Sequence, residues 1–96
     1  MSEATLTVDC RPDGDDWRCI VTVGDGSDAT RHEVSVRADD VRRLGSGATA
    51  DELVRASFGF LLEREPRESI LRAFDLPAIG RYFPDYEREM QRRLRS

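Results

Sequence analysis

The feature that most constrains this chain is the helix predicted over residues 50–64, because its apolar surface is too wide to be covered from one side. At 100° per residue, its apolar and small side chains, from Leu53 to Leu62, sweep roughly 240° of the helix. Such a helix has to lie between two layers. We therefore expect a central helix between a sheet and either the C-terminal segments or a second copy of the chain.

Three segments before this helix alternate apolar and polar residues with the period of half-buried strands. They are residues 4–10, 17–24 and 30–37. A Pro-Asp-Gly-Asp turn separates the first two, and an Asp-Gly pair separates the last two. Since each strand has one apolar face, the sequence predicts an α+β fold: a three-stranded antiparallel β-meander packed on the central helix, followed by short C-terminal helices.

The link between the last strand and the central helix carries its own start and stop signals. Asp39 is expected to cap a short helix that the glycines at 45 and 47 end. Thr49, with Glu52 three residues on, has the pattern of a capping box for the central helix.

Prolines divide the C-terminal region into short elements. Pro66 is expected to end the central helix and to begin a short helix that reaches Phe74. Asp75 is expected to cap one further turn. Pro84 then opens a final helix with a narrow apolar stripe formed by Tyr86, Met90 and Leu94.

The length, composition and charge of the chain limit the classes of protein to which it can belong. Its 96 residues suffice for one domain, with a β-meander half (1–37) and a helical half (38–96). No apolar run reaches the length of a membrane span, and the N-terminus lacks the pattern of a signal peptide. The two cysteines form no secreted-type framework, so we expect a cytoplasmic protein without a membrane partner. The net charge of −4 makes a nucleic-acid partner unfavourable.

Cys10, Cys19 and His32 are the residues that come nearest to a metal site. The first turn places Cys10 opposite Cys19 on the apolar face. A two-residue second loop would put His32 opposite Cys19, whereas a four-residue loop over 25–28 would put Val34 there, which matches the apolar positions better. Because no fourth ligand is evident, we expect no metal and no other cofactor. The two cysteines are expected to be free core residues that act as small hydrophobes.

The sequence offers little for catalysis. It contains no lysine and a single histidine, which leaves few groups for nucleophilic or acid-base chemistry. Ser57 lies on the buried side of the predicted central helix, beside Gly59, and is expected to be a packing residue. The acidic residues fall in turns, at caps or beside arginines. We therefore expect a protein that is not an enzyme.

One stretch resembles a known DNA-binding module. Residues 32–65, HEVSVRADDVRRLGSGATADELVRASFGFLLERE, resemble a ribbon-helix-helix module over about a third of the chain. The resemblance implies a dimer that lays strand 30–37 in the major groove, with Glu33, Ser35 and Arg37 as readers. It makes a DNA-binding regulator or antitoxin the alternative function.

A second resemblance covers the C-terminal half, roughly residues 50–89. The string FGFLLEREPRESILRAFDLPAIGRYFPDYE resembles a family of small bacterial proteins with no assigned activity. This resemblance implies no activity, cofactor or catalytic residue. It does imply that the region from Phe58 to Tyr86 is a recurring unit.

Arg81 and Tyr82 are the candidate partner-binding residues. They begin an aromatic run near the C-terminus, and tyrosine and arginine are residue types that anchor interfaces. Phe83 and Tyr86, in the same run, have the alternative role of holding the last helix on the central one. The sequence thus favours a non-enzymatic protein-interaction or regulatory module. Its partner would be an unknown protein, or a second copy bound through the apolar face of helix 50–64.

Overall fold

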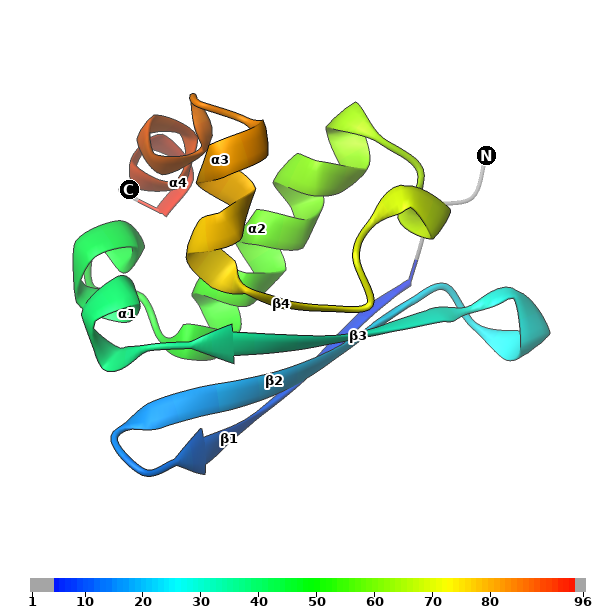
Figure 1. Ribbon diagram of the computed structural model, residues 1–96, viewed down its shortest axis with the longest axis horizontal. Coiled ribbons are helices and arrows are strands. Elements are labelled where there is room, and N and C mark those ends of the chain that lie inside the picture. Colours follow the sequence, from blue (N-terminus) through cyan, green and yellow to red (C-terminus); the bar gives the residue numbers. More distant parts are fainter. Residues whose placement is uncertain (1–4, 95–96) are drawn as a thin grey trace.

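The computed structural model describes residues 5–94 and has an α+β fold, in which the helices cover one face of a four-stranded sheet (Figure 1). The strands are β1 (Leu6–Asp13), β2 (Asp16–Val23), β3 (Thr30–Val36) and β4 (Ala73–Asp75). The helices are α1 (Ala38–Gly45), α2 (Ala50–Arg64), α3 (Ile79–Tyr82) and α4 (Tyr86–Leu94). Short 3₁₀ turns are η1 (Gly26–Asp28), η2 (Arg67–Ser69) and η3 (Leu76–Ala78). None of the helices within residues 5–94 is long and apolar enough to span a membrane.

Two hairpin connections set the register of the first three strands. A tight turn at Gly14, whose φ is 67°, joins β1 to β2 and pairs Cys10 with Cys19. On the other side of β2, Cys19 pairs with Val34. The longer of the two loops considered for residues 25–28 is therefore confirmed, and His32 does not lie opposite Cys19.

The prediction of a short helix from Pro66 to Phe74 is wrong. This segment forms only the turn η2 and then β4, which pairs in parallel with β3. The backbone N–H of Glu33 donates to the carbonyl of Arg72 at 2.7 Å. Because the second edge of β3 carries unpaired backbone groups, pairing there replaces the hydrogen bonds of a local helix. The sheet is therefore mixed and four-stranded, rather than the three-stranded antiparallel meander that the alternation predicts.

The prediction of a central helix is confirmed, and the chain itself covers its apolar surface. The sheet lies on one side of α2 and the C-terminal helices on the other (Figure 1). The Tyr86 hydroxyl lies 2.7 Å from the hydroxyl of Ser57, and the Phe83 ring meets the Phe60 ring edge-on at 5.8 Å. Tyr86 and Phe83 thus hold the C-terminal elements on α2. The C-terminal segments therefore form the second covering layer.

The helix caps are partly as predicted. The capping box of α2 is confirmed: Glu52 N–H donates to the Thr49 hydroxyl at 3.1 Å, and Thr49 N–H donates to the Glu52 carboxylate at 2.9 Å. Asp39, predicted to cap α1, lies inside its first turn instead. The buried Asp40 carboxylate accepts the backbone N–H of Arg37 at 3.0 Å, so Arg37 is the N-cap and α1 begins two residues earlier than predicted.

The last turn of α4 gathers basic side chains around one carboxylate. Glu89 accepts hydrogen bonds from Arg92 Nη2 at 2.7 Å and from Arg93 Nε at 3.3 Å. The hydrogen bonds from Arg92, and next from Arg93, lower the pKa of Glu89 to about 2. Arg95, the last basic residue of this tail, lies outside the described residues.

We expect this carboxylate to make stability depend on pH in the acid range. Because folding lowers the pKa of Glu89, its contribution is complete above the unfolded value of about 4.3 and is lost as the pH falls toward 2. Carboxyl NMR titration should report a pKa of about 2 for Glu89. Replacing Glu89 by Gln should remove this step from a plot of melting temperature against pH. An ordinary glutamate pKa in the titration would contradict the arrangement.

Candidate functional site

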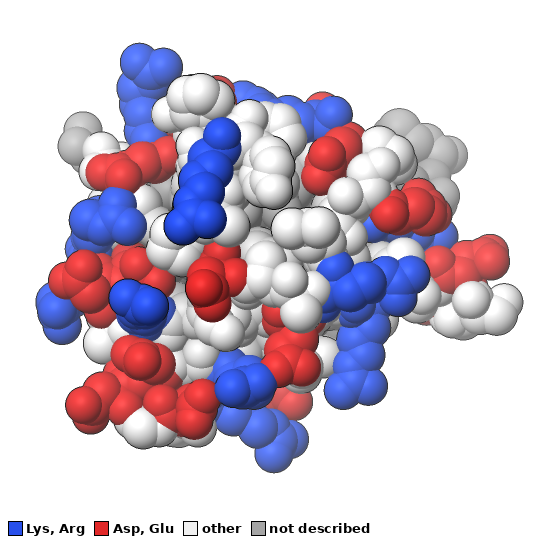
Figure 2. Space-filling model, viewed as in Figure 1, with Lys and Arg blue, Asp and Glu red and all other residues white. Residues whose placement is uncertain are grey.

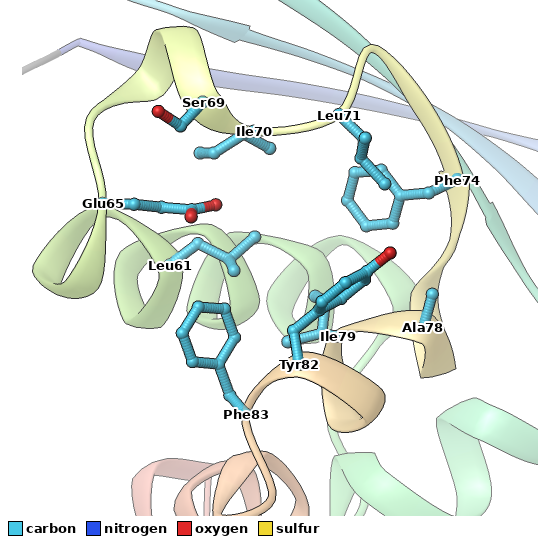
Figure 3. A pocket seen from close by; sticks show the side chains of 10 residues that line it. All are labelled: Leu61, Glu65, Ser69, Ile70, Leu71, Phe74, Ala78, Ile79, Tyr82 and Phe83. Carbon is cyan, nitrogen blue, oxygen red and sulfur yellow. The ribbon is translucent and has the colours of Figure 1, made fainter.

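An apolar hollow of about 400 Å³ lies between the C-terminal end of α2, the segment that leads into β4, and α3 (Figure 3). We name it the α2–α3 groove. Its apolar lining includes Leu61, Ile70, Leu71, Phe74, Ile79 and Phe83. Its polar groups come from Glu65, Ser69 and Tyr82. The lining is thus largely apolar, with a few polar groups that could orient a ligand.

The proline after α2 opens this groove. Glu65 precedes Pro66 and takes an extended conformation, with a φ of −153°, which ends the helix and turns the chain away from its axis. The chain returns along the edge of β3 as β4, so that the returning segment forms the opposite wall. Ile70 and Ile79, which are only 4% and 3% exposed, close the floor.

His32 supports the wall of the groove from the core. Its Nδ1 lies 2.8 Å from the backbone carbonyl of Leu71, and since a carbonyl only accepts, Nδ1 carries the proton. Its Nε2 lies 2.9 Å from the hydroxyl of Thr30. The imidazole is fully buried and packs against the Phe58 ring at 5.4 Å. The backbone of Leu71 is therefore tied to β3 while its side chain remains at the surface.

The mouth of the groove is formed by two exposed hydrophobic residues. Leu71 is 52% exposed and Tyr82 is 68% exposed, and among residues 5–94 these are the exposed large hydrophobic side chains. They come from opposite walls of the same hollow (Figure 3). Scattered apolar side chains are ordinary on a protein surface, but two at one concave site mark it as a candidate for binding.

The groove lies in an uncharged region with charged surroundings. Figure 2 shows uncharged atoms gathered at the centre of the face that α3 and the segment before β4 form, with side chains of both signs around them. Glu65 is a half-buried residue of the groove, and its carboxylate forms no ion pair with any residue between 5 and 94. Arg72 and Arg81, each next to a mouth residue in the sequence, are exposed.

The two candidate partner-binding residues are adjacent in α3, but only one of them lines the α2–α3 groove. Tyr82 lines the groove, whereas Arg81 is exposed and does not line it. The sequence did not identify three other groove residues as candidates: Glu65, Leu71 and Phe74. Glu65 lies at the end of α2, whereas Leu71 and Phe74 come from the segment that leads into and forms β4, and the parallel pairing of β4 with β3 places that segment at the same hollow.

The cysteine prediction needs a correction, because Cys10 and Cys19 form a disulfide and are not free core thiols. They face each other at a non-hydrogen-bonded pair of the β1–β2 ladder, where the Cα atoms are 4.0 Å apart. That register was expected, but the covalent bond was not. Within the described part of the chain, no group of three or more metal-ligating side chains gathers at one place.

Ser57 is a packing residue, as predicted, and takes part in a buried hydrogen-bond network. Its hydroxyl donates to the Leu53 carbonyl at 2.8 Å and meets the Tyr86 hydroxyl at 2.7 Å. Burial raises the pKa of the Tyr86 phenol. Ser57 and His32 are therefore both held by core partners and lie away from the mouth of the groove.

The residues of the ribbon-helix-helix resemblance lie in a different setting from the one that it implies. β3 pairs with β2 on one edge, and β4 pairs with its residues 33–35 on the other, so the centre of that edge is already occupied. On the outer face of the sheet, Glu33 is paired with Arg18. No protein-family model, no curated protein and no solved structure matches this chain. The function of the α2–α3 groove is therefore inferred from its geometry.

Proposed function

We propose that this protein is a non-enzymatic protein-interaction module, in which the α2–α3 groove receives apolar side chains from a short segment of a partner protein. One observation carries the proposal. Leu71 and Tyr82, the exposed large hydrophobic side chains of the described residues, both stand at the mouth of one apolar hollow. Exposed apolar side chains that gather at a concave site are typical of an interaction surface.

The size and residue types of the groove support a partner segment. A hollow of about 400 Å³ accommodates several side chains and not the face of a globular domain. Covering Leu71 and Tyr82 would contribute about 25 cal/mol for each Å² of apolar surface removed from water. Tyrosine and arginine often dominate binding energy, so Tyr82 is the proposed anchor and the neighbouring Arg81 a proposed rim contact.

Other functions have less support. The apolar face of α2 is covered by α4 and the sheet, which removes the reason for a dimer through that face. A ribbon-helix-helix dimer would need a free edge on β3, where β2 occupies one edge and β4 occupies residues 33–35 of the other. Of the groups suited to catalysis, His32 and Ser57 are buried in core hydrogen bonds. These observations favour binding over DNA recognition or catalysis.

Removing both mouth side chains should abolish binding without harming the fold. Short random peptides displayed on phage would be selected on the wild type, and the affinity of synthetic copies measured by fluorescence anisotropy. Leu71→Ser with Tyr82→Ser should lower the affinity for these peptides by more than about a hundredfold, since interface anchors are worth about 2 kcal/mol or more each. Because both side chains are exposed, the free energy of unfolding should change by only about 0.5 kcal/mol.

Two single variants provide the controls. Tyr82→Phe keeps the aromatic ring and should retain most of the affinity, whereas Arg81→Ala should weaken it by a smaller factor than loss of the ring. Peptides that bind the double variant as well as the wild type would place the binding site elsewhere. If light scattering showed a dimer that the double variant lost, the groove would belong to a second copy of the chain.

A further inference from the structure

We infer that the segment bound in the α2–α3 groove carries a basic side chain, lysine or arginine, beside its apolar residues, and that Glu65 receives it. This inference rests on the proposed function and adds the charge of the partner. It follows from the position of one carboxylate, from the lack of a cation beside it, and from the aromatic rings that share its site.

Glu65 is held in place by the local backbone. It is the C-cap residue of α2, its N–H donates to the Leu61 carbonyl at 2.9 Å, and the proline that follows keeps its backbone extended. Figure 3 shows its side chain reaching from the helix end into the groove, between Leu61 and Ile70. The carboxylate of this half-buried residue is therefore directed into a mainly apolar hollow.

The two arginines nearest to Glu65 in the sequence are held by other groups. Arg64 pairs with Asp85, and its guanidinium lies over the Phe60 ring, 3.9 Å from the centroid. Arg67 pairs with Glu68 at 3.3 Å and packs against Gly24 at the end of β2. Within residues 5–94, no ion pair and no side-chain hydrogen bond reaches the Glu65 carboxylate.

The surroundings of Glu65 favour a cation over other ligands. A carboxylate only accepts hydrogen bonds, so it matches an ammonium or guanidinium group and repels an acidic one. Covering the groove would remove water from this carboxylate, which makes an unpaired charge unfavourable and a paired one stronger. The rings of Phe74, Tyr82 and Phe83 line the same hollow, and aromatic faces also attract cations.

The basic side chain needs apolar neighbours to remain in the groove. A single exposed ion pair contributes little to binding, so a cation alone would be held weakly. Leu71 and Tyr82 at the mouth supply the contacts for the apolar residues, while Glu65 selects the charge beside them. The partner class is therefore a short basic and apolar protein segment, not a small amine.

The test compares peptides that differ at one position. Selection from the phage library on the wild type should enrich lysine or arginine beside aliphatic or aromatic residues. A selected peptide would then be synthesised with lysine or glutamine at the enriched position, and both forms measured by fluorescence anisotropy. We expect the lysine form to bind the wild type about five to ten times more tightly. Glu65→Gln, which keeps the size of the side chain, should reduce this preference to near one.

Glu68→Gln is the matched control, because it removes one acidic charge three residues away that does not line the groove. It should leave the lysine preference unchanged. Butylammonium alone should not compete with the peptide, and competition by this small amine as strong as that by the peptide would indicate a small-molecule site instead.

The inference and the proposed function can fail separately. In one outcome, Leu71→Ser with Tyr82→Ser abolishes peptide binding, but the peptides show no preference for a basic residue, or Glu65→Gln leaves that preference intact. This outcome would overturn the inferred charge of the partner and would leave the proposed interaction module standing. If no selected peptide depends on Leu71 and Tyr82, the proposed function fails and the inference fails with it.

Discussion

Replacing Phe58 by alanine is expected to lower the free energy of unfolding by about 3–5 kcal/mol, because truncation removes buried apolar surface and leaves a cavity. The Phe58 ring is fully buried on α2. It packs against the imidazole of His32 at 5.4 Å and against the Phe74 ring at 6.1 Å. Phe58 therefore joins the central helix to β3 and to β4.

Urea unfolding followed by circular dichroism would measure this loss. Phe58→Leu is the control, since it keeps most of the apolar volume and should be destabilising by less than about 1.5 kcal/mol. A loss below about 1 kcal/mol for Phe58→Ala would mean that the ring is not a central part of the core. Because Phe74 lines the α2–α3 groove, Phe58→Ala should also weaken peptide binding, while Phe58→Leu should largely preserve it.

Removing the disulfide is expected to be the next largest effect. Replacing Cys10 and Cys19 together by alanine should lower the free energy of unfolding by about 2–3 kcal/mol, because a cross-link between residues nine apart restricts the unfolded chain. Reduction of the wild type should have a similar effect. The two measurements check each other, since alanine also removes the Cys19 side chain, which is fully buried.

Thiol alkylation with mass spectrometry gives the direct readout of the same bond. Without reductant, both cysteines should resist alkylation in the unfolded protein, and both should react once reductant is added. The α2–α3 groove lies away from the β1–β2 hairpin, so peptide binding by the folded alanine variant should be unchanged. Two alkylated cysteines in protein that was never exposed to reductant would contradict the disulfide.

The elements that could be predicted from the sequence depend on residues close together in the chain. The width of the apolar surface over residues 50–64 required two covering layers, and Thr49 with Glu52 defined where α2 begins. The turn at Gly14 set the register of the first hairpin, including Cys10 opposite Cys19. Hairpin registers and helix caps depend on local turn geometry and local hydrogen bonds, which neighbouring residues determine.

The segment after Pro66 could not be predicted in the same way. Ile70 and Phe74 are four residues apart, a spacing that fits a helix, yet they lie before and within an extended segment. The edge of β3 accepts this segment through the bonds from Glu33 to Arg72 and from His32 to Leu71. These contacts span long stretches of sequence, and no local pattern indicates them.

The same distinction between local sequence and contacts of distant segments applies to the candidate site. The residue types near the C-terminus pointed to Arg81 and Tyr82, and holding the last helix on the central one was the alternative role for Phe83 and Tyr86, which contact α2 in the structure. That Tyr82 faces Leu71 across a hollow, with Glu65 inside it, depends on β4 joining the sheet. The α+β class, the central helix and the first hairpins could be predicted because they depend on local periodicity and turn chemistry. The fourth strand, the disulfide and the groove could not, because each requires groups from separate elements to meet in the folded chain.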